Sequence, residues 1–375
     1  MDQIKAAREE DARVAKAGRE EAERVAKAGR EEAERVAKAR TDRLSALAAI
    51  AVNNLAETPS NMPSIGIPNQ ACTCYFNTVF QVLFSISLVL SNILQMDNYK
   101  HDDIITALQN VFLEMSDTSK GAVVEQETLE AFFFRFGGFH KEAEKFDTGS
   151  QETPVETAMK LIERCEAAAV KRGLKGAETN WFKDVFDVQE TTTKTNCQTR
   201  EVRVVPGDGM PFLAITLPTM GGSVEKDLTN KLTEQSQTQE AHFKWAPIGT
   251  SDEETKTYPD LPHGVTYELY SNTPNLVVDI TRSTGIEKMK GVYSFGRKLD
   301  VFGHTYNLQS VVVHYGKSIR SGHYIAFKIM GGEWWKYDDT HVTQSSWEQG
   351  MDYGFGGRED YTANLLVYTK SGRAM

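Results

Sequence analysis

The chain has 375 residues, of which 40% are hydrophobic and 10% aromatic, so it is long and apolar enough to bury a sizeable core. Four cysteines are too few for a disulfide framework, and no repeated CxxC pair offers zinc ligands, which favours a reducing cytoplasmic or nuclear compartment. The charged N-terminus carries no visible secretory signal and no apolar run reaches the roughly 20 residues that span a bilayer, so we expect a soluble protein without a membrane span.

The net charge of −10 is unevenly distributed along the chain. Residues 1–44 carry 12 Lys/Arg and 11 Asp/Glu side chains, which leaves 30 basic and 41 acidic side chains in the remainder. This acidic body argues against nucleic acid as the main partner and favours a partner with basic segments. The same charge would also serve solubility alone, and composition does not decide between the two.

The N-terminal 51 residues are built on an 11-residue repeat. It occurs three times, over 8–18, 19–29 and 30–40. Eleven residues make three helical turns, so equivalent positions stack on one face, and acidic residues stand four positions before basic ones in the order that stabilises a helix. We therefore predict a charged helix over 1–51, followed by a proline-containing linker over 52–65.

The role of this repeat helix is left open by its sequence. Its apolar positions are mostly alanine, which suits a solvated spacer or a weakly self-associating helix. A helix that docks on a helical partner is a second reading. A helix lying on a lipid surface would need bulkier apolar residues and an excess of basic charge, and the repeat has neither.

From residue 66 onward a helical half precedes a half rich in strands. Periodicity predicts helices over 74–96, 103–116, 125–135 and 154–171. It predicts strands over 186–193, 199–206, 211–217, 276–282, 299–301, 306–316, 322–330, 333–337 and 363–369. Helices and strands that do not alternate along the chain indicate the α+β class.

Cys74 is the first candidate for chemistry, because it lies in the first turn of the predicted helix over 74–96. A helix N-terminus stabilises a thiolate through its dipole and its unpaired N–H groups. Phe76, Phe80 and Leu83 follow at helical spacing, which predicts that this helix is buried. Periodicity alone also allows a buried cysteine that only packs.

The residues around Cys74 form a spaced pattern: Gly66, Asn69, Thr73, Cys74, Tyr75, Asn77, Gln81 and Leu83. This pattern resembles the cysteine box of the ubiquitin-specific proteases, which are papain-like cysteine peptidases that remove ubiquitin. The resemblance implies that Cys74 is the nucleophile. In the family an asparagine two residues earlier donates to the oxyanion, and here that position is Cys72. A thiol is a weak donor, and losing one oxyanion donor typically costs about 10²–10³ in rate, so we expect slower catalysis.

A second candidate segment lies about 250 residues further along the chain. Residues 311–316 and 322–327 alternate as two strands of a hairpin, whose loop is 317–321, and 334–339 has the pattern of a third strand. This arrangement resembles the histidine box of the same family.

The histidine box supplies the remaining members of the predicted triad. The resemblance implies that His323 is the general base, that Asp338 orients its imidazole, and that Asp339 is an auxiliary carboxylate. A histidine takes a thiol proton near neutral pH, and a carboxylate on its far nitrogen fixes the tautomer. His314 and His341 lie outside the motif position, and we expect structural roles for both.

The resemblance implies a catalytic domain over 66–372 with the papain-like architecture of fingers, palm and thumb. Many family members carry two CxxC pairs that bind zinc in the fingers. Here Cys197 stands alone, and Lys194 occupies the place of a partner thiol. We expect no structural zinc and no other cofactor, so that packing alone must hold the fingers.

The leading functional hypothesis is a thiol-dependent deubiquitinase that hydrolyses the isopeptide or peptide bond after the C-terminal glycine of ubiquitin. Its partner would be ubiquitin or a ubiquitinated protein, whose basic tail suits the acidic body. A catalytically weak ubiquitin-binding scaffold is the alternative, motivated by Ala71 and Cys72. A third hypothesis keeps the chemistry and changes the substrate to a ubiquitin-like modifier. Competent residues at all three triad positions favour an enzyme.

Overall fold

The computed structural model describes residues 65–70, 72–96, 101–117, 123–137, 153–175, 179, 181–207, 213–216, 222–235, 237, 239–247, 250–284, 287–318, 321–355 and 360–371, together with Arg24, Lys27, Glu31, Arg35, Lys38 and Asp42. The chain divides into two compact units, Met1–Ala51 and Val52–Met375. The six described residues of the first unit are helical and exposed, and Lys27 forms an i,i+4 ion pair with Glu31 at 3.8 Å. The rest of the predicted repeat helix, and the predicted linker apart from Ile65, lie outside the described residues.

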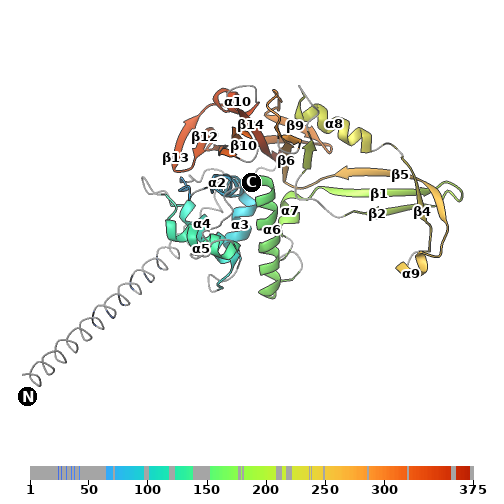
Figure 1. The fold of residues 1–375 in the computed structure, drawn as a ribbon, viewed down its shortest axis with the longest axis horizontal. Helices are drawn as coiled ribbons and strands as arrows, with labels where there is room; N and C mark the ends of the chain where they lie inside the picture. Colours follow the sequence, from blue (N-terminus) through green and yellow to red (C-terminus); the bar gives the residue numbers. More distant parts are fainter. Residues whose placement is uncertain are drawn as a thin grey trace, which may run out of the picture. The chain divides into compact units, whose positions relative to one another are not determined.

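The N-terminal part of the second unit is helical (Figure 1). Its helices are α2 (Cys74–Phe84), α3 (Ser87–Gln95), α4 (Ile104–Met115), α5 (Gln126–Phe136), α6 (Pro154–Lys171) and α7 (Trp181–Phe186). Helix α6 begins with Pro at its first position and a Thr153–Glu156 capping box, which fixes its start. The helices α4, α5 and α6 confirm three of the four predicted ones to within about two residues at each end.

The predicted single helix over 74–96 is wrong, because α2 and α3 meet at an angle of 92°. Ile86 is extended and buried between them, at φ −96° and ψ 103°. The segment is apolar nearly all round, so a straight helix could not have buried every face, and the bend allows both halves to pack. Among the described residues no single helix is long and apolar enough to cross a membrane, and only this bent pair passes that test, on length and composition alone.

Aromatic rings lock α2 against α5. Phe76 meets Phe133 and Phe136 edge-on, with ring centroids 5.1 and 4.8 Å apart, and Phe80 meets Phe132 in the same way at 4.8 Å. Edge-to-face pairs of this kind add about 0.5–1.5 kcal/mol beyond the burial of their area. The helix that begins with Cys74 is therefore held rigidly along its length.

A large sheet forms the second half of the domain. In the described residues its main path runs β13 (His341–Ser345), β12 (Glu333–Asp338), β11 (Ser321–Met330), β10 (His304–Ser318), β14 (Tyr361–Lys370), β6 (Asn275–Thr281) and β3 (Leu213–Thr216), with β7 (Ser283–Thr284), β8 (Glu287–Lys288) and β9 (Lys298–Val301) joined beside it. All its pairs are antiparallel except β3 with β6. Helix α2 packs on the face beside β11, and α10 (Trp347–Gly354) covers the opposite face (Figure 1).

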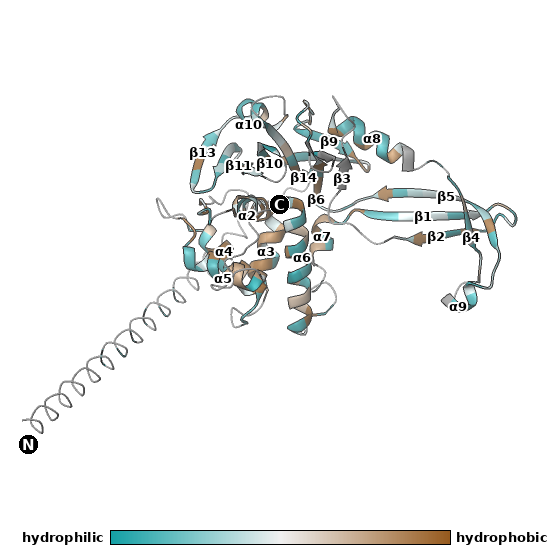
Figure 2. Ribbon diagram, viewed as in Figure 1, coloured by the Kyte–Doolittle hydropathy of each residue, from teal (hydrophilic) through white to brown (hydrophobic). Residues whose placement is uncertain are grey.

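A smaller sheet extends from the large one. It has the order β2 (Val202–Pro206), β1 (Gln189–Asn196), β5 (Asp260–Tyr270) and β4 (Gln239–Lys244), with α8 (Val224–Gln235) and the short α9 (Asp252–Thr255) in the connections. Its edge strand β2 exposes Val202, Val204 and Val205. Figure 2 shows brown, hydrophobic colour on this strand. The strands β4 and β5 were not predicted: β4 is largely polar and exposed, and β5 carries Pro262, His263 and Gly264 in its first half, so neither shows a clear apolar alternation along its whole length.

A stack of side chains ties this small sheet together. The guanidinium of Arg203 lies 4.0 Å over the ring of Trp245, whose other side stacks on His263 at 4.5 Å. Glu201 accepts from both the Trp245 indole Nε1 (2.5 Å) and Arg203 Nε (3.1 Å), and Arg203 Nη1 donates to the carbonyl of Ala246. The stack therefore joins β2, β5 and the segment after β4.

Replacing Trp245 by alanine should loosen the small sheet, because both stacking partners lose their shared ring. We expect the local free energy of opening, measured by hydrogen exchange of β1, β2 and β5, to fall by about 2 kcal/mol. The control is Trp347→Ala, which removes a tryptophan that packs against the large sheet instead. Unchanged exchange in the small sheet of the Trp245 variant would show that the stack contributes nothing.

Candidate active site

The segment before α2 is fixed to the turn after β12. The backbone N–H of Ile67 donates to the carbonyl of Asp339 at 2.9 Å, and the carbonyl of Gly66 accepts from Val124 at 3.2 Å. A Cβ on Gly66 would lie 2.5 Å from the backbone oxygen of Thr340, so only glycine allows this close approach. The cysteine segment and the carboxylate segment thus meet directly.

Cys74 is the first residue of α2 and is buried. The preceding Thr73 makes no side-chain cap, because its hydroxyl instead accepts from the backbone N–H of Gln70 at 2.9 Å. The backbone N–H of Thr73 donates to Asn69 Oδ1 at 3.1 Å. The N-terminus of α2, without a side-chain cap from Thr73, therefore lies at the thiol, and a helix N-terminus stabilises negative charge.

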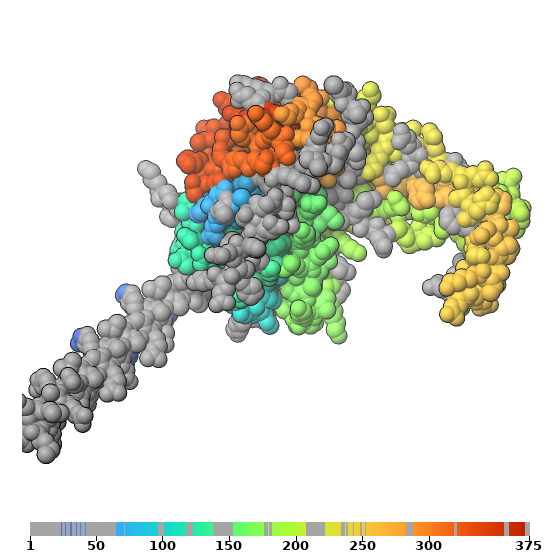
Figure 3. Space-filling model, viewed as in Figure 1, coloured from blue at the N-terminus to red at the C-terminus, as the bar shows by residue number. Residues whose placement is uncertain are grey.

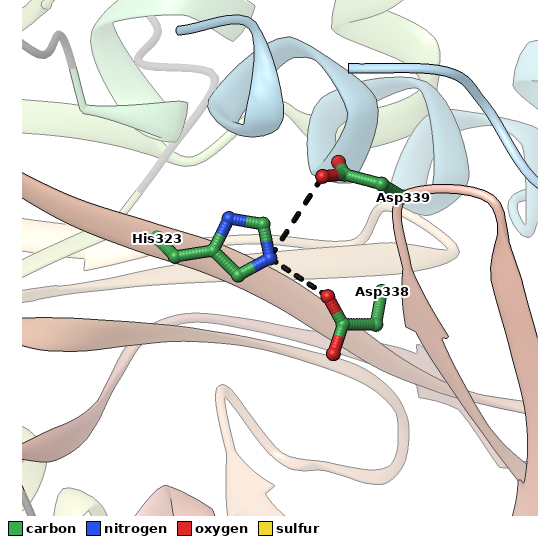
Figure 4. Close-up of side chains that lie close together, drawn as sticks. All are labelled: His323, Asp338 and Asp339. Carbon is green, nitrogen blue, oxygen red and sulfur yellow. Dashed lines mark hydrogen bonds and ion pairs between the residues drawn. The ribbon is translucent and has the colours of Figure 1, made fainter.

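His323 stands between the thiol and a carboxylate. Its Nε2 lies 2.7 Å from Asp338 Oδ1 and 3.9 Å from Asp339 Oδ2, and Figure 4 shows both carboxylates converging on this one nitrogen. The side chain of His323 is also hydrogen bonded to that of Cys74. Since Nε2 is taken by Asp338, the nitrogen left for the thiol is Nδ1. The structure thus brings together Cys74, His323 and Asp338.

The charges of this group reinforce one another. The hydrogen bond to Asp338, followed by that to Cys74, raises the pKa of His323 to about 10. In return the hydrogen bond from His323, aided by Lys336, holds the pKa of Asp338 well below its usual range. Lys336 Nζ lies 2.9 Å from Asp338 Oδ2. The carboxylate on one side of His323 and the thiol on the other therefore both favour the protonated form of its imidazole.

Asp339 has a different task from Asp338. It adopts a left-handed backbone conformation with φ 52°, which turns its side chain toward the cysteine segment. Its Oδ1 accepts from Asn77 Nδ2 at 2.8 Å, and its Oδ2 accepts from Asn69 Nδ2 at 3.0 Å. Asp339 therefore joins the start of α2 to the carboxylate turn and orients both amides.

Asn69 and Asn77 carry a role that the sequence pattern contained but did not assign. Asn77 also donates to the carbonyl of Ile67 at 3.2 Å, so it anchors the segment that leads into α2. Asn69 is exposed, and its amide is oriented from one side by Asp339 and from the other by Thr73. Cys72 is exposed in the turn before α2. The sequence held one signal for their role: both asparagines belong to the spaced pattern around Cys74, although no function or partner was predicted for either.

Two further described histidines, His314 and His341, do not join this group. His314 is buried, and burial, with the nearby charges of Lys288 and His323, lowers its pKa to about 3. It is therefore neutral, and its ring packs against Tyr324 at 4.6 Å. His341 is exposed on the edge strand β13.

The residues His323, Asp338 and Asp339 form the only group in the described parts of the chain whose ligand atoms are close enough to hold a metal ion. Their atoms are already hydrogen bonded to one another and to neighbouring side chains, and the set contains no thiolate from the small sheet. Cys197, the cysteine of that sheet, is exposed and unpaired in disulfides. These residues do not fit a structural zinc site.

The sequence of the chain matches a family of known proteins. The family model described as ubiquitin carboxyl-terminal hydrolase matches residues 65–368. The ubiquitin carboxyl-terminal hydrolase 26 of Arabidopsis thaliana is 22% identical over 74% of this chain and 26% of its own length. The ubiquitin carboxyl-terminal hydrolase 7 of Caenorhabditis elegans is 22% identical over 88% of this chain and 29% of its own length. The chain therefore spans less than a third of the length of these curated relatives.

Proposed function

Because the chain belongs to the ubiquitin carboxyl-terminal hydrolase family, we propose that it is a cysteine-type deubiquitinase that cleaves the isopeptide or peptide bond after the C-terminal glycine of ubiquitin. One observation carries the proposal: His323 is hydrogen bonded to Asp338 through Nε2 and to the thiol of Cys74. A nucleophile, a base and an orienting carboxylate in this contact are the parts of a thiol hydrolase.

The geometry supports a two-step mechanism. The Cys74 thiolate attacks the carbonyl carbon of the terminal glycine, and the oxyanion forms beside the N–H groups at the start of α2. His323 gives its proton to the leaving amine, and the C–N bond breaks to leave a thioester on Cys74. His323, now neutral, takes a proton from a water molecule that attacks the thioester; the C–S bond then breaks, which releases the glycine carboxylate and restores the Cys74 thiolate beside protonated His323. Asp338 keeps the imidazole in one orientation throughout.

Oxyanion stabilisation has two candidate side chains. Cys72 stands at the position that we predicted for the family's donor, and it offers only a thiol. Asn69 offers an amide N–H group, already oriented by Asp339 and Thr73 beside the N-terminus of α2. We propose Asn69 as the donor, with Asp339 as the auxiliary carboxylate that positions it.

The parts of the fold support an assignment of thumb, palm and fingers. The helices α2–α7 would form the thumb, the large sheet the palm and the small sheet the fingers. The face seen in Figure 3 is hollowed between α6 (green) and the far end of the small sheet (yellow). Such a hollow would receive a folded domain such as ubiquitin. For residues 1–51 we propose a spacer or a self-associating helix.

The proposal is tested with ubiquitin that carries a C-terminal electrophile. We expect a covalent adduct, with peptide mapping that assigns the bond to Cys74, and no adduct in the Cys74→Ala protein. The Cys72→Ala protein should still react. An adduct that persists in Cys74→Ala would contradict the assigned nucleophile, and binding of ubiquitin without any adduct would favour a scaffold. Reaction with a ubiquitin-like electrophile alone would change the substrate.

A further inference from the structure

A buried lysine lies behind the hairpin that carries His323. Lys288 belongs to the two-residue strand β8 and is 8% exposed. Its Nζ donates to three backbone carbonyls, those of Gly316 (2.9 Å), His314 (3.1 Å) and Asp360 (2.5 Å). A single ammonium group thus joins β8, the end of β10 and the segment that precedes β14.

The backbone explains why these carbonyls need such a partner. Strand β10 pairs with β14 at Tyr306–Leu308, and further along the strand the backbone N–H of Gly316 donates to the carbonyl of Asp360 at 3.4 Å. Alternate residues of a strand direct their carbonyls to the same edge, so the oxygens of His314 and Gly316 both face away from β11. Buried carbonyls without a partner cost about 1–3 kcal/mol each. Lys288 Nζ satisfies both of these carbonyls.

The same stretch of β10 sets the position of His323. Tyr315, between the two carbonyls, is the register partner of His323 on β11. The pairing then shifts before Ser318 meets Ser321. Gly316 and Gly322 lie within this irregularity, with φ values of 158° and 152°. Because the β10–β11 ladder is irregular at this point, it does not fix the hairpin by itself. A contact from outside the ladder, such as that of Lys288, can therefore stabilise the position of the hairpin.

Holding a charged amine at this place is costly. Burial, opposed only in part by Asp360, lowers the pKa of Lys288 to about 7. The nearby cations Arg282 and Lys290 lower it further. The Asp360 carboxylate is itself ion paired with Lys290. A methionine would fill the same space without this penalty, which indicates that the donor function is what Lys288 contributes.

We propose that Lys288 is a positioning residue for the reaction, which holds the β10–β11 hairpin so that His323 lies against Cys74. This inference rests on the proposed function of the His323–Cys74 pair. It assigns Lys288 no contact with substrate. The anchor acts through the carbonyls of His314 and Gly316, and a misplacement of about 1 Å at a reacting group can cost about 10²-fold in rate.

The test compares Lys288→Met and Lys288→Arg with the control Lys290→Met. Lys290 is a cation in the same neighbourhood, and in the described residues it binds a carboxylate, that of Asp360, and no backbone carbonyl. We expect kcat on a fluorogenic ubiquitin substrate to fall about 10²-fold in Lys288→Met, with KM changed less than about threefold. Lys288→Arg should recover about tenfold of the loss, because a guanidinium can still donate. Lys290→Met should stay within about twofold of the wild type.

A second readout does not depend on ubiquitin. Alkylation of Cys74 by iodoacetamide at pH 7 should slow about tenfold or more in Lys288→Met, because the thiolate loses its imidazolium partner. If folded Lys288→Met had the same alkylation rate and the same kcat as the wild type, the inference would be overturned, even if the melting temperature of the variant fell. If Lys288→Met does not fold, Lys288→Gln replaces it and is judged by the same two rates. If the wild-type protein reacted with iodoacetamide but not with the ubiquitin electrophile or the fluorogenic ubiquitin substrate, the proposed function would be refuted, whereas the effect of Lys288 on the reactivity of Cys74 could still be measured.

Discussion

Replacing Asp338 by asparagine is expected to lower kcat/KM by about 10³–10⁴. The carboxylate receives the Nε2 hydrogen bond of His323 at 2.7 Å and is the largest cause of that residue's raised pKa. An amide of the same shape lacks the charge that stabilises the imidazolium and can hold the ring in the wrong tautomer. Both effects deprive the Cys74 thiolate of its imidazolium partner.

The same substitution has a signature in the pH dependence. In the wild type the imidazolium persists up to a pKa of about 10, so the alkaline limb of activity should lie well above neutrality. In Asp338→Asn this limb should move toward neutral pH. Because the folded-state pKa of His323 is raised, its stabilisation of the fold is complete below about pH 6.5 and is lost as pH rises through about 10. The wild type and the variant should therefore differ more in melting temperature at pH 6 than at pH 10.

The matched control is Asp184→Asn, which removes a carboxylate exposed on α7. It should leave both the rate and the alkaline limb unchanged. If Asp338→Asn kept its alkaline limb in place, the carboxylate would not be the group that sets the protonation of His323. Asp339 would then be the next carboxylate to test, since it lies 3.9 Å from the same nitrogen.

The fold was predictable where burial imposed a period on the sequence. The strands β6, β10, β11, β12 and β14 form the centre of the large sheet and follow the predicted ranges closely, because their apolar residues are buried. The helices α8 and α10 were missed, since α8 is mostly polar and α10 is only eight residues long. The predicted strand over 186–193 runs across the end of α7 and the start of β1. No local pattern marks such a change of element within so few residues.

The candidate site also contains residues that the sequence predicted and residues that it did not. Cys74, His323 and Asp338 were named from motifs, and the structure places them in contact across about 250 residues of sequence. The partners of Asp339 could not be named, because they depend on a left-handed turn that brings it to the start of α2. Lys288 could not be found either, since its partners are backbone carbonyls that carry no sequence signal.

Replacing Asn69 by alanine is expected to lower kcat by about 10²–10³ while KM changes less than about threefold, because an oxyanion donor acts mainly in the transition state. Its Nδ2 is held 3.0 Å from Asp339 Oδ2, and its Oδ1 lies 3.1 Å from the Thr73 backbone nitrogen at the helix start. Alkylation of Cys74 by iodoacetamide should keep its rate, since the contacts of His323 with Asp338 and Cys74 are untouched. That pair of results separates loss of an oxyanion donor from loss of thiol activation.

Two variants of Cys72 test whether the oxyanion donor is Asn69 or the side chain at the position of Cys72. If the exposed Cys72 does not reach the oxyanion, both Cys72→Ala and Cys72→Asn should keep kcat within about threefold of the wild type. If instead its position faces the oxyanion, Cys72→Asn should raise kcat by about tenfold or more, because an amide N–H is a far better donor than a thiol. Steady-state kinetics on one fluorogenic substrate measure all three variants side by side. A faster Cys72→Asn together with an unaffected Asn69→Ala would move the oxyanion donor from Asn69 to the position of Cys72 and explain the slow catalysis expected from the thiol.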